Sequence, residues 1–210
     1  MVLDAAPKVE PDVRSRPAAD GGKPLRADAQ RNRARVLAAA EAAFFEEGVS
    51  VPLDEIARRA GVGPGTVYRH FPNKEVLFEA VYVGRVERLT ERARELADSD
   101  DPGGVFFGFV AHMVNEGSDK RVLVDAMIGA GIDVSSVARS VTDGLRVSIG
   151  ELLTRAQAVG VVRSDVGVWD IMRLVAGMAM TAHLSGTDAR GSDRALAVVC
   201  DGLRAIPGDG

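Results

Sequence analysis

The sequence predicts an all-α fold of about nine helices. Apolar residues recur at intervals of three, four and seven through most of the chain, which is the period of a helix buried on one face. Glycine and proline end these runs, and no stretch shows the sustained two-residue alternation of a strand. Because 46% of the residues are hydrophobic and only 5% aromatic, the core must be mainly aliphatic.

Composition divides the chain into three regions. Residues 1–26 are rich in Pro, Ala, Gly and charge and have no period, so we expect a disordered N-terminal tail. Residues 27–75 read as a small unit of three helices, and residues 76–210 as a larger helical domain. The formal net charge is −4, but the part before residue 76 is mildly basic and the part after it is acidic.

Each helix of the small unit has a recognisable start or end. The first is expected from Asp28, a candidate N-cap, to Gly48. In the second, VPLDEIARRAG, Pro52 suits the first helical position and Gly61 stops the helix. The third is expected to end at a proline, and the helix after it to be capped by Asn73. The expected inward-facing residues are Val36, Leu37, Ala40, Phe44, Leu53, Ile56, Ala57, Ala60, Val67 and Phe71.

Two short helices joined by a glycine turn form a helix-turn-helix, which points to DNA. In GVGPGTVYRHFPNKE, Gly65 would let the backbone approach DNA closely, and Thr66 offers a methyl and a hydroxyl to a base edge. Lys74 lies in the first turn of the next helix, where free N–H groups already attract phosphate. Three-helix packing without DNA binding is the alternative. The other polar or exposed positions of the segment are Pro64, Tyr68, Arg69 and His70.

The detail of residues 33–78 resembles the DNA-binding region of the tetracycline-repressor (TetR) family of transcriptional regulators. The likeness lies in the end of the first helix, AAFFEEG, in IARRAGV, and in GTVYRHFPNKEVL. One departure is that Val51 and Pro52 stand where the family usually has Ser or Thr, so a hydroxyl that caps the helix and can touch phosphate is lost, unless Ser50 replaces it.

The resemblance implies a sequence-specific regulator, a repressor by default with activation left open. It would bind a palindromic DNA operator as a homodimer, with half-sites about one helical turn apart or slightly more. A small-molecule effector would enter the C-terminal domain, shift the helix that runs from Asn73 to about Ala97, and release the DNA. The implied DNA contacts are Pro64, Gly65, Thr66, Tyr68, His70 and Lys74, with Arg33 and Arg69 added.

The C-terminal domain offers residues for the effector and for the dimer. Phenylalanine, histidine and methionine gather there, and thioethers adapt to varied ligands. Plain core packing is the alternative for each of them. The candidate ligand contacts are Phe106, Phe109, His112, Met113, Met127 and Met172, of which the first four are expected on one helical face. The candidate dimer contacts are Trp169, Leu174, Gly177, Thr181, Leu196, Val199 and Leu203.

Other classes of function find less support. There is no glycine-rich phosphate loop, no GxSxG, no HExxH and no paired His or Cys spacing, so we expect neither an enzyme nor a metal or other cofactor. A helical adaptor that binds only protein is the remaining rival. One cysteine, no apolar run long enough to span a bilayer and no apolar leader favour a cytoplasmic protein.

Overall fold

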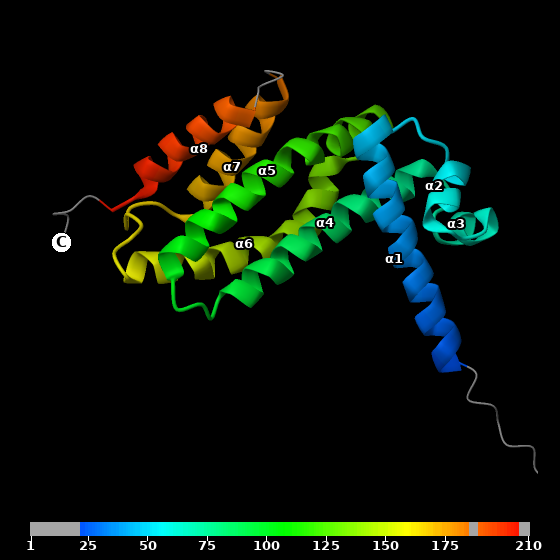
Figure 1. The fold of residues 1–210 in the computed structure, drawn as a ribbon, viewed down its shortest axis with the longest axis horizontal. Coiled ribbons are helices and arrows are strands. Elements are labelled where there is room, and N and C mark those ends of the chain that lie inside the picture. Colours follow the sequence, from blue (N-terminus) through cyan, green and yellow to red (C-terminus); the bar gives the residue numbers. More distant parts are fainter. Residues whose placement is uncertain (1–21, 185–188, 206–210) are drawn as a thin grey trace, which may run out of the picture.

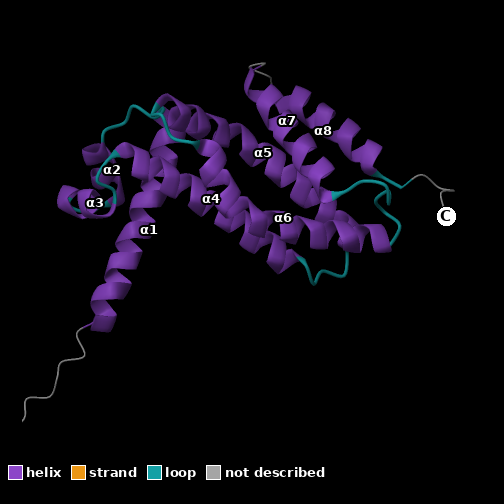
Figure 2. Ribbon diagram, turned by 180° about the vertical axis from the view of Figure 1, so that it is seen from behind, coloured by secondary structure: helices purple, strands orange, loops and turns teal. Residues whose placement is uncertain are grey.

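The computed structural model describes residues 22–184 and 189–205, and over these ranges the chain forms eight helices (Figure 1). Apart from one isolated bridge between Val162 and Arg204, these ranges contain helices and loops without strands (Figure 2). The all-α prediction is confirmed. The helices are α1 Gly22–Glu47, α2 Leu53–Ala60, α3 Pro64–His70, α4 Lys74–Leu96, α5 Pro102–Gly129, α6 Val134–Ala158, α7 Val168–Leu184 and α8 Ala189–Leu203.

Two helices differ from the expectation. The segments VFFGFVAHMV and RVLVDAMIGAG, expected as separate helices, belong to the single helix α5. Gly117 lies between them inside α5, since a helix tolerates a single glycine at a cost of about 1 kcal/mol. A Cβ there would come within 2.6 Å of the Ala179 Cβ, so a glycine lets α5 and α7 approach closely. Helix α1 begins at Gly22, inside the expected tail, since a proline in a first turn loses no helical hydrogen bond. Residues 1–21 of the expected tail lie outside the described residues.

Helices α1, α2 and α3 pack at one end of the molecule through inward-facing side chains (Figure 1). Ile56 of α2, Val67 of α3 and Phe71 after α3 are fully buried, as their spacing predicts. Phe44 near the end of α1 meets Phe78 of α4 edge to face, with ring centroids 5.0 Å apart. Helix α1, on which α2 and α3 pack, is therefore also fixed to α4.

Helices α4 to α7 form the larger bundle, and α8 lies against α7 on its outer side (Figure 1). Helix α5 packs on α7, α6 and α4, and α4 packs on α6. Side chains cap three of these helices: Asn73 accepts from Val76 N at 2.9 Å, as expected, and Asp101 and Asp133 cap α5 and α6. Helix α4 is the element that belongs to both ends of the molecule.

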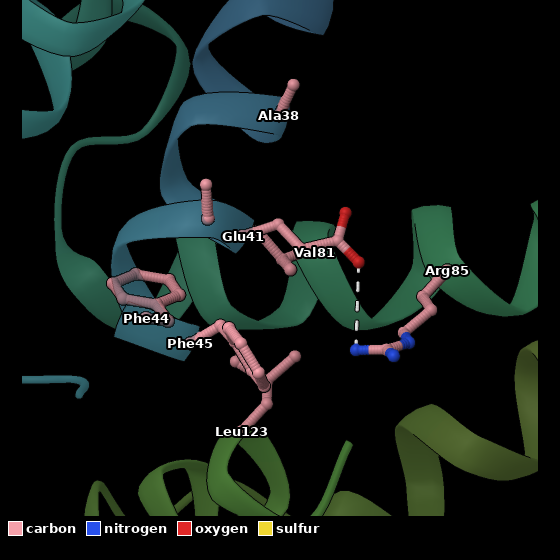
Figure 3. A pocket seen from close by; sticks show the side chains of 8 residues that line it. Ala38, Glu41, Phe44, Phe45, Val81, Arg85 and Leu123 are labelled. Atoms are coloured by element: carbon pink, nitrogen blue, oxygen red, sulfur yellow. Dashed lines mark ion pairs between the residues drawn. The ribbon is translucent and has the colours of Figure 1, made fainter. Parts of the chain in front are cut away.

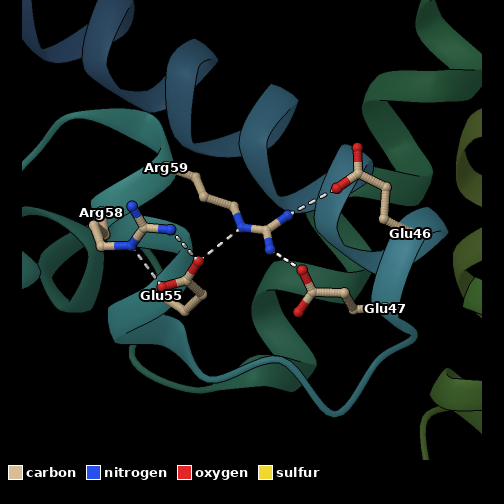
Figure 4. Close-up of polar contacts among 5 residues, drawn as sticks. All are labelled: Glu46, Glu47, Glu55, Arg58 and Arg59. Atoms are coloured by element: carbon tan, nitrogen blue, oxygen red, sulfur yellow. Dashed lines mark hydrogen bonds and ion pairs between the residues drawn. The ribbon is translucent and has the colours of Figure 1, made fainter.

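A network of charged side chains holds α2 to the end of α1 (Figure 4). Arg59 donates to Glu55 on its own helix at 2.9 Å and to Glu46 on α1 at 3.0 Å, and it also pairs with Glu47. Arg58 donates twice to Glu55, at 2.7 and 2.8 Å. These hydrogen bonds from Arg58 and then Arg59 lower the pKa of Glu55 from 4.5 to about 2.

The depressed pKa of Glu55 predicts an acid-dependent contribution to stability. Its carboxylate stabilises the fold fully above pH 4.5, and this contribution is lost as the pH falls from 4.5 towards about 2. We expect Glu55→Gln to lower the thermal midpoint at neutral pH, and the gap from the natural protein to close over that window. Midpoints measured by circular dichroism across this pH range test the prediction.

Asp54→Asn is the matched control, because Asp54 lies in the same first turn of α2 but takes no part in the network. It should leave the pH profile of the natural protein in place. A gap between Glu55→Gln and the natural protein that stays constant through the acid range contradicts the proposed role of the network.

Candidate nucleic-acid interface

The turn between α2 and α3 has a fixed geometry. Gly61 ends α2 with φ 62° and ψ 39°, a left-handed conformation that glycine adopts without strain. Its N–H and that of Val62 bond the last carbonyls of α2, and Arg35 of α1 donates to the Gly61 carbonyl at 3.1 Å. Gly63 is the N-cap of α3, and its carbonyl accepts a hydrogen bond from Thr66 N at 2.9 Å. The turn and the buried Val67 together set the orientation of α3.

The candidate DNA contacts on α3 lie on its solvent side. Tyr68 is 47% exposed, Pro64, Gly65 and Arg69 are exposed, and Thr66 and His70 are half-buried. A Cβ added at Gly65 would meet no atom within 4 Å, so packing within the chain does not require a glycine there. Arg33 of α1 joins this surface, because its guanidinium lies 5.6 Å from the centroid of the Phe71 ring. We call Arg33, residues 64–66, residues 68–70 and Lys74 the α3 surface.

Arginines differ in how far the protein neutralises them. Arg58 and Arg59 are paired with the acidic residues of the α1–α2 network. Among the described residues, no ion pair joins Arg33 or Arg69 to an acidic side chain. Arg33 and Arg69 therefore keep guanidinium groups that no described acidic side chain neutralises, and cations on the α3 surface are what DNA binding requires.

Lys74 has a structural contact that the sequence did not predict. Its ammonium donates to the carbonyl of Ser50 at 2.7 Å and approaches that of Val49 at 3.3 Å, and so links α4 to the α1–α2 loop. Pro52 is the N-cap of α2 rather than its first residue, and no side chain caps that end. The hydroxyl lost at positions 51 and 52 is therefore not replaced as a cap.

A cavity of about 370 Å³ lies between α4, α5, α6 and α7. Two candidate ligand residues, Met113 and Met172, line it. The other lining residues were not predicted from the sequence. Leu145 and Ile149, for example, belong to an apolar stripe of α6 that predicts burial but does not show where four helices leave space. The other described lining residues are Arg85, Leu89, Glu116, Gly117, Val124, Leu145, Thr142, Ile149, Val175, Ala176 and Ala179.

The remaining candidate ligand residues lie elsewhere. Phe106 and Met127 are fully buried core residues and do not line this cavity. Phe109 and His112 line a separate groove of about 380 Å³ beside α4. The expectation of one shared face was wrong for His112, because six residues at 3.6 per turn put it about 120° from Phe106; its ring is exposed, with Nε2 3.4 Å from a Glu116 oxygen.

The candidate dimer residues separate into exposed and buried ones. Trp169 is 55% exposed and lies under the Arg146 guanidinium, Leu174 is 38% exposed, and Gly177 is also exposed. Leu203 is instead a buried core residue of its own chain. Arg163 N donates a backbone hydrogen bond to the Leu203 carbonyl, which fixes the end of α8 to the α6–α7 loop. Leu196 and Val199 are half-buried against the core, and the side chain of Thr181 lies outside the described residues.

Helix-turn-helix geometry with an exposed second helix, attached to a helical bundle that holds a cavity, defines the class as a DNA-binding regulator. The sequence pattern of bacterial regulatory proteins of the tetR family matches residues 36–81, and that of the SbtR-like transcriptional regulator C-terminal domain matches residues 101–205. This chain belongs to the TetR family of DNA-binding transcriptional regulators, which are not enzymes.

Solved structures and characterised relatives agree with this assignment. The TetR transcription regulatory protein from Mycobacterium vanbaalenii is 45% identical, with a TM-score of 0.73 over 87% of this chain and 100% of that one. The regulator SCO0520 from Streptomyces coelicolor is 32% identical, with a TM-score of 0.71 over 83% and 99%. The HTH-type transcriptional regulator UidR of Escherichia coli K12 is 26% identical over 72% of this chain and 79% of its own. Over residues 22–184 and 189–205, no helix is long and apolar enough to cross a membrane.

Gly65→Ala separates DNA contact from folding. Open space surrounds this position, and alanine is favoured over glycine in a helix by about 1 kcal/mol, so the thermal midpoint should stay equal or rise. DNA affinity should fall, because a methyl group would keep the backbone from the groove. Gly108→Ala, at an open exposed position of α5, is the control and should leave affinity unchanged. Equal DNA affinity for Gly65→Ala and the natural protein would remove Gly65 from the interface.

Two substitutions divide the roles of Lys74. Lys74→Gln can still donate to the Ser50 carbonyl but has no charge, whereas Lys74→Ala loses both. Both should weaken binding to all DNA sequences and reduce the salt slope by about one, as for one lost phosphate contact. Only Lys74→Ala should also lower the thermal midpoint clearly. A salt slope that neither variant changes would leave Lys74 with a structural role only.

Proposed function

We propose that this regulator is a repressor that binds a palindromic operator as a homodimer and leaves it when a small molecule enters the cavity. The observation that carries the proposal is the α3 surface, with Gly65 in open space and Arg33 and Arg69 outside any described ion pair. Such a surface fits a major groove, with polar side chains for base edges and cations for phosphate.

Homodimerisation is supported by the composition of the α7 and α8 surface. Val198 is 65% exposed, and Leu174 on the neighbouring helix adds a second exposed aliphatic side chain. Ala195, Ala197 and Gly177 are also exposed on these two helices. Exposed apolar residues of this kind favour a partner, and a two-fold axis lets α7 and α8 of both copies cover one another. The two α3 surfaces of such a dimer would meet two half-sites.

Release by a ligand is supported by the position of α4. Its first turn is tied to the α1–α2 loop through Lys74, and its middle lines the cavity through Arg85 and Leu89. A ligand that displaces the middle of α4 would therefore move its first turn and the helix-turn-helix with it. The mechanism requires that the ligand bind the DNA-free arrangement more tightly.

Selection from randomised duplex DNA tests the proposed function. We expect an enriched palindrome with half-sites about one helical turn apart or slightly more. In a reporter strain, a promoter that contains this sequence should be expressed less when the protein is present. Randomised DNA without an enriched palindrome would contradict the proposal. A rise in expression of the reporter when the protein is present would make the protein an activator.

Leu174→Glu and Val198→Glu together test the dimer. Both side chains are exposed in one chain, so the double variant should fold, run as a monomer in light-scattering chromatography and bind the palindrome weakly. Ile128→Glu is the control, since it places a charge on another exposed aliphatic side chain, on α5. A double variant that remains dimeric contradicts the proposed interface.

A further inference from the structure

Arg85 of α4 lines two cavities. It lines the cavity between α4 and α7 together with Glu116. It also lines a second cavity, of about 330 Å³, where α1 crosses α4 and Leu123 of α5 closes the far side (Figure 3). Glu41 of α1 lies in that second cavity and faces the Arg85 guanidinium (Figure 3). The Arg85 side chain thus contacts both the candidate ligand site and α1. We call helices α1, α2 and α3 the DNA-reading end.

The guanidinium of Arg85 contacts α1 and α5 from α4. One Nη donates to the Glu116 backbone carbonyl at 2.8 Å, and Nε lies 3.5 Å from a Glu116 carboxylate oxygen. The other Nη lies 3.7 Å from Glu41, which is an ion pair but too long for a good hydrogen bond. The Arg85 side chain is only 11% exposed, so these charges interact in partly desolvated surroundings.

Glu41 and Glu116, the two described carboxylates that pair with Arg85, each have a second basic neighbour. Arg88 donates to both oxygens of Glu41, at 2.6 and 2.9 Å, which is far closer than Arg85. His112 Nε2 lies 3.4 Å from the other side of Glu116. A guest anion can therefore take the Arg85 guanidinium while Glu41 stays paired with Arg88 and Glu116 keeps its neighbour His112. The exchange of Arg85 from Glu41 to a ligand therefore leaves neither of these carboxylates without a basic neighbour.

The remainder of the cavity suits an alkyl chain. Of the described residues that line it, Arg85 is the one cation, and none is aromatic. Leucine, isoleucine, valine and alanine form most of the wall beside the polar Glu116 and Thr142, and Met113 and Met172 add thioethers that adapt to a flexible chain. A guanidinium beside an aliphatic cavity matches an apolar tail that ends in a planar anion, because the arginine fork binds carboxylates through two hydrogen bonds.

We propose that the effector is an amphipathic monoanion of the alkyl carboxylate class, whose carboxylate binds Arg85 and displaces Glu41. This inference rests on the proposed function, since it names the ligand of that same cavity. Glu41 belongs to α1, so the exchange removes the longer of its two contacts with α4 and leaves the one with Arg88, also on α4, in place. Arg85 is both the group that recognises the ligand and the group that reports its presence to α1.

Calorimetric titration of the purified full-length protein with decanoic acid, decanol and decylamine tests the ligand class, because the three share one alkyl chain. We expect the acid to bind about tenfold or more tightly than the alcohol, as a charge-assisted hydrogen bond requires, and the amine to bind most weakly. In Arg85→Gln the ratio of acid to alcohol affinity should fall to about one. Arg85→Lys should retain part of it, since the charge remains without the fork.

Arg94→Gln is the matched control, because it removes the same charge from α4 at an exposed position outside the cavity. It should preserve the preference for the acid. Thermal midpoints of all variants establish that each is folded. Equal binding of acid and alcohol, preference for the amine, binding of none of the three, or an acid preference that survives Arg85→Gln would overturn the proposal.

DNA binding is measured separately on the selected palindrome by fluorescence anisotropy. Decanoate should release the natural protein from this DNA and should release Arg85→Gln far less. A protein that binds decanoate but enriches no palindrome contradicts the proposed function and leaves the ligand class intact. A protein that binds its palindrome but takes no alkyl acid contradicts the ligand class alone.

Discussion

Phe44 and Phe78 meet edge to face where α1 crosses the start of α4, and the DNA-reading end depends on that contact. Helices α2 and α3 have 8 and 7 residues, which is too short for stability in isolation. They are held by packing on α1 and on each other, with Ile56, Val67 and Phe71 buried. The aromatic pair that fixes α1 to α4 adds about 1 kcal/mol beyond its buried area. The orientation of α3 is therefore a consequence of how α1 packs on α4, and any shift of α4 reaches it.

The arginines around α2 and α3 fall into a group paired with acidic residues and a group with no described partner of this kind. Arg59 faces the end of α1 and is neutralised by Glu46, Glu47 and Glu55, so its charges contribute to holding α2 rather than to binding DNA. Arg33 and Arg69 belong to the α3 surface and have no acidic partner among the described residues. A helix-turn-helix with a small net charge can thus present cations to DNA, because Arg58 and Arg59 are neutralised within the α1–α2 network while Arg33 and Arg69 are not neutralised by any described side chain.

Sequence spacing predicted the parts of this fold that depend on one helix at a time. The burial of Ile56, Val67 and Phe71 and the Asn73 cap follow from local periodicity and capping rules. The cavity could not be predicted in this way, because its volume depends on how side chains of four helices meet. The need for a glycine at position 117 likewise depends on Ala179, which belongs to another helix. The end of α8 is fixed by a backbone hydrogen bond to the α6–α7 loop, which is far away in sequence.

Weak coupling through Arg85 is sufficient if the protein acts as a dimer. The ion pair between Arg85 and Glu41 is long, at 3.7 Å, and contributes about 1 kcal/mol, so its loss in one subunit lowers DNA affinity only about fivefold. Two subunits on one palindrome lose it twice, about 2 kcal/mol or thirtyfold, which lies within the range of allosteric coupling energies. A fully buried, tightly hydrogen-bonded pair would couple more strongly, but a carboxylate ligand could not displace it. The long contact to Glu41 and the short one from Arg88 are what an exchangeable link requires.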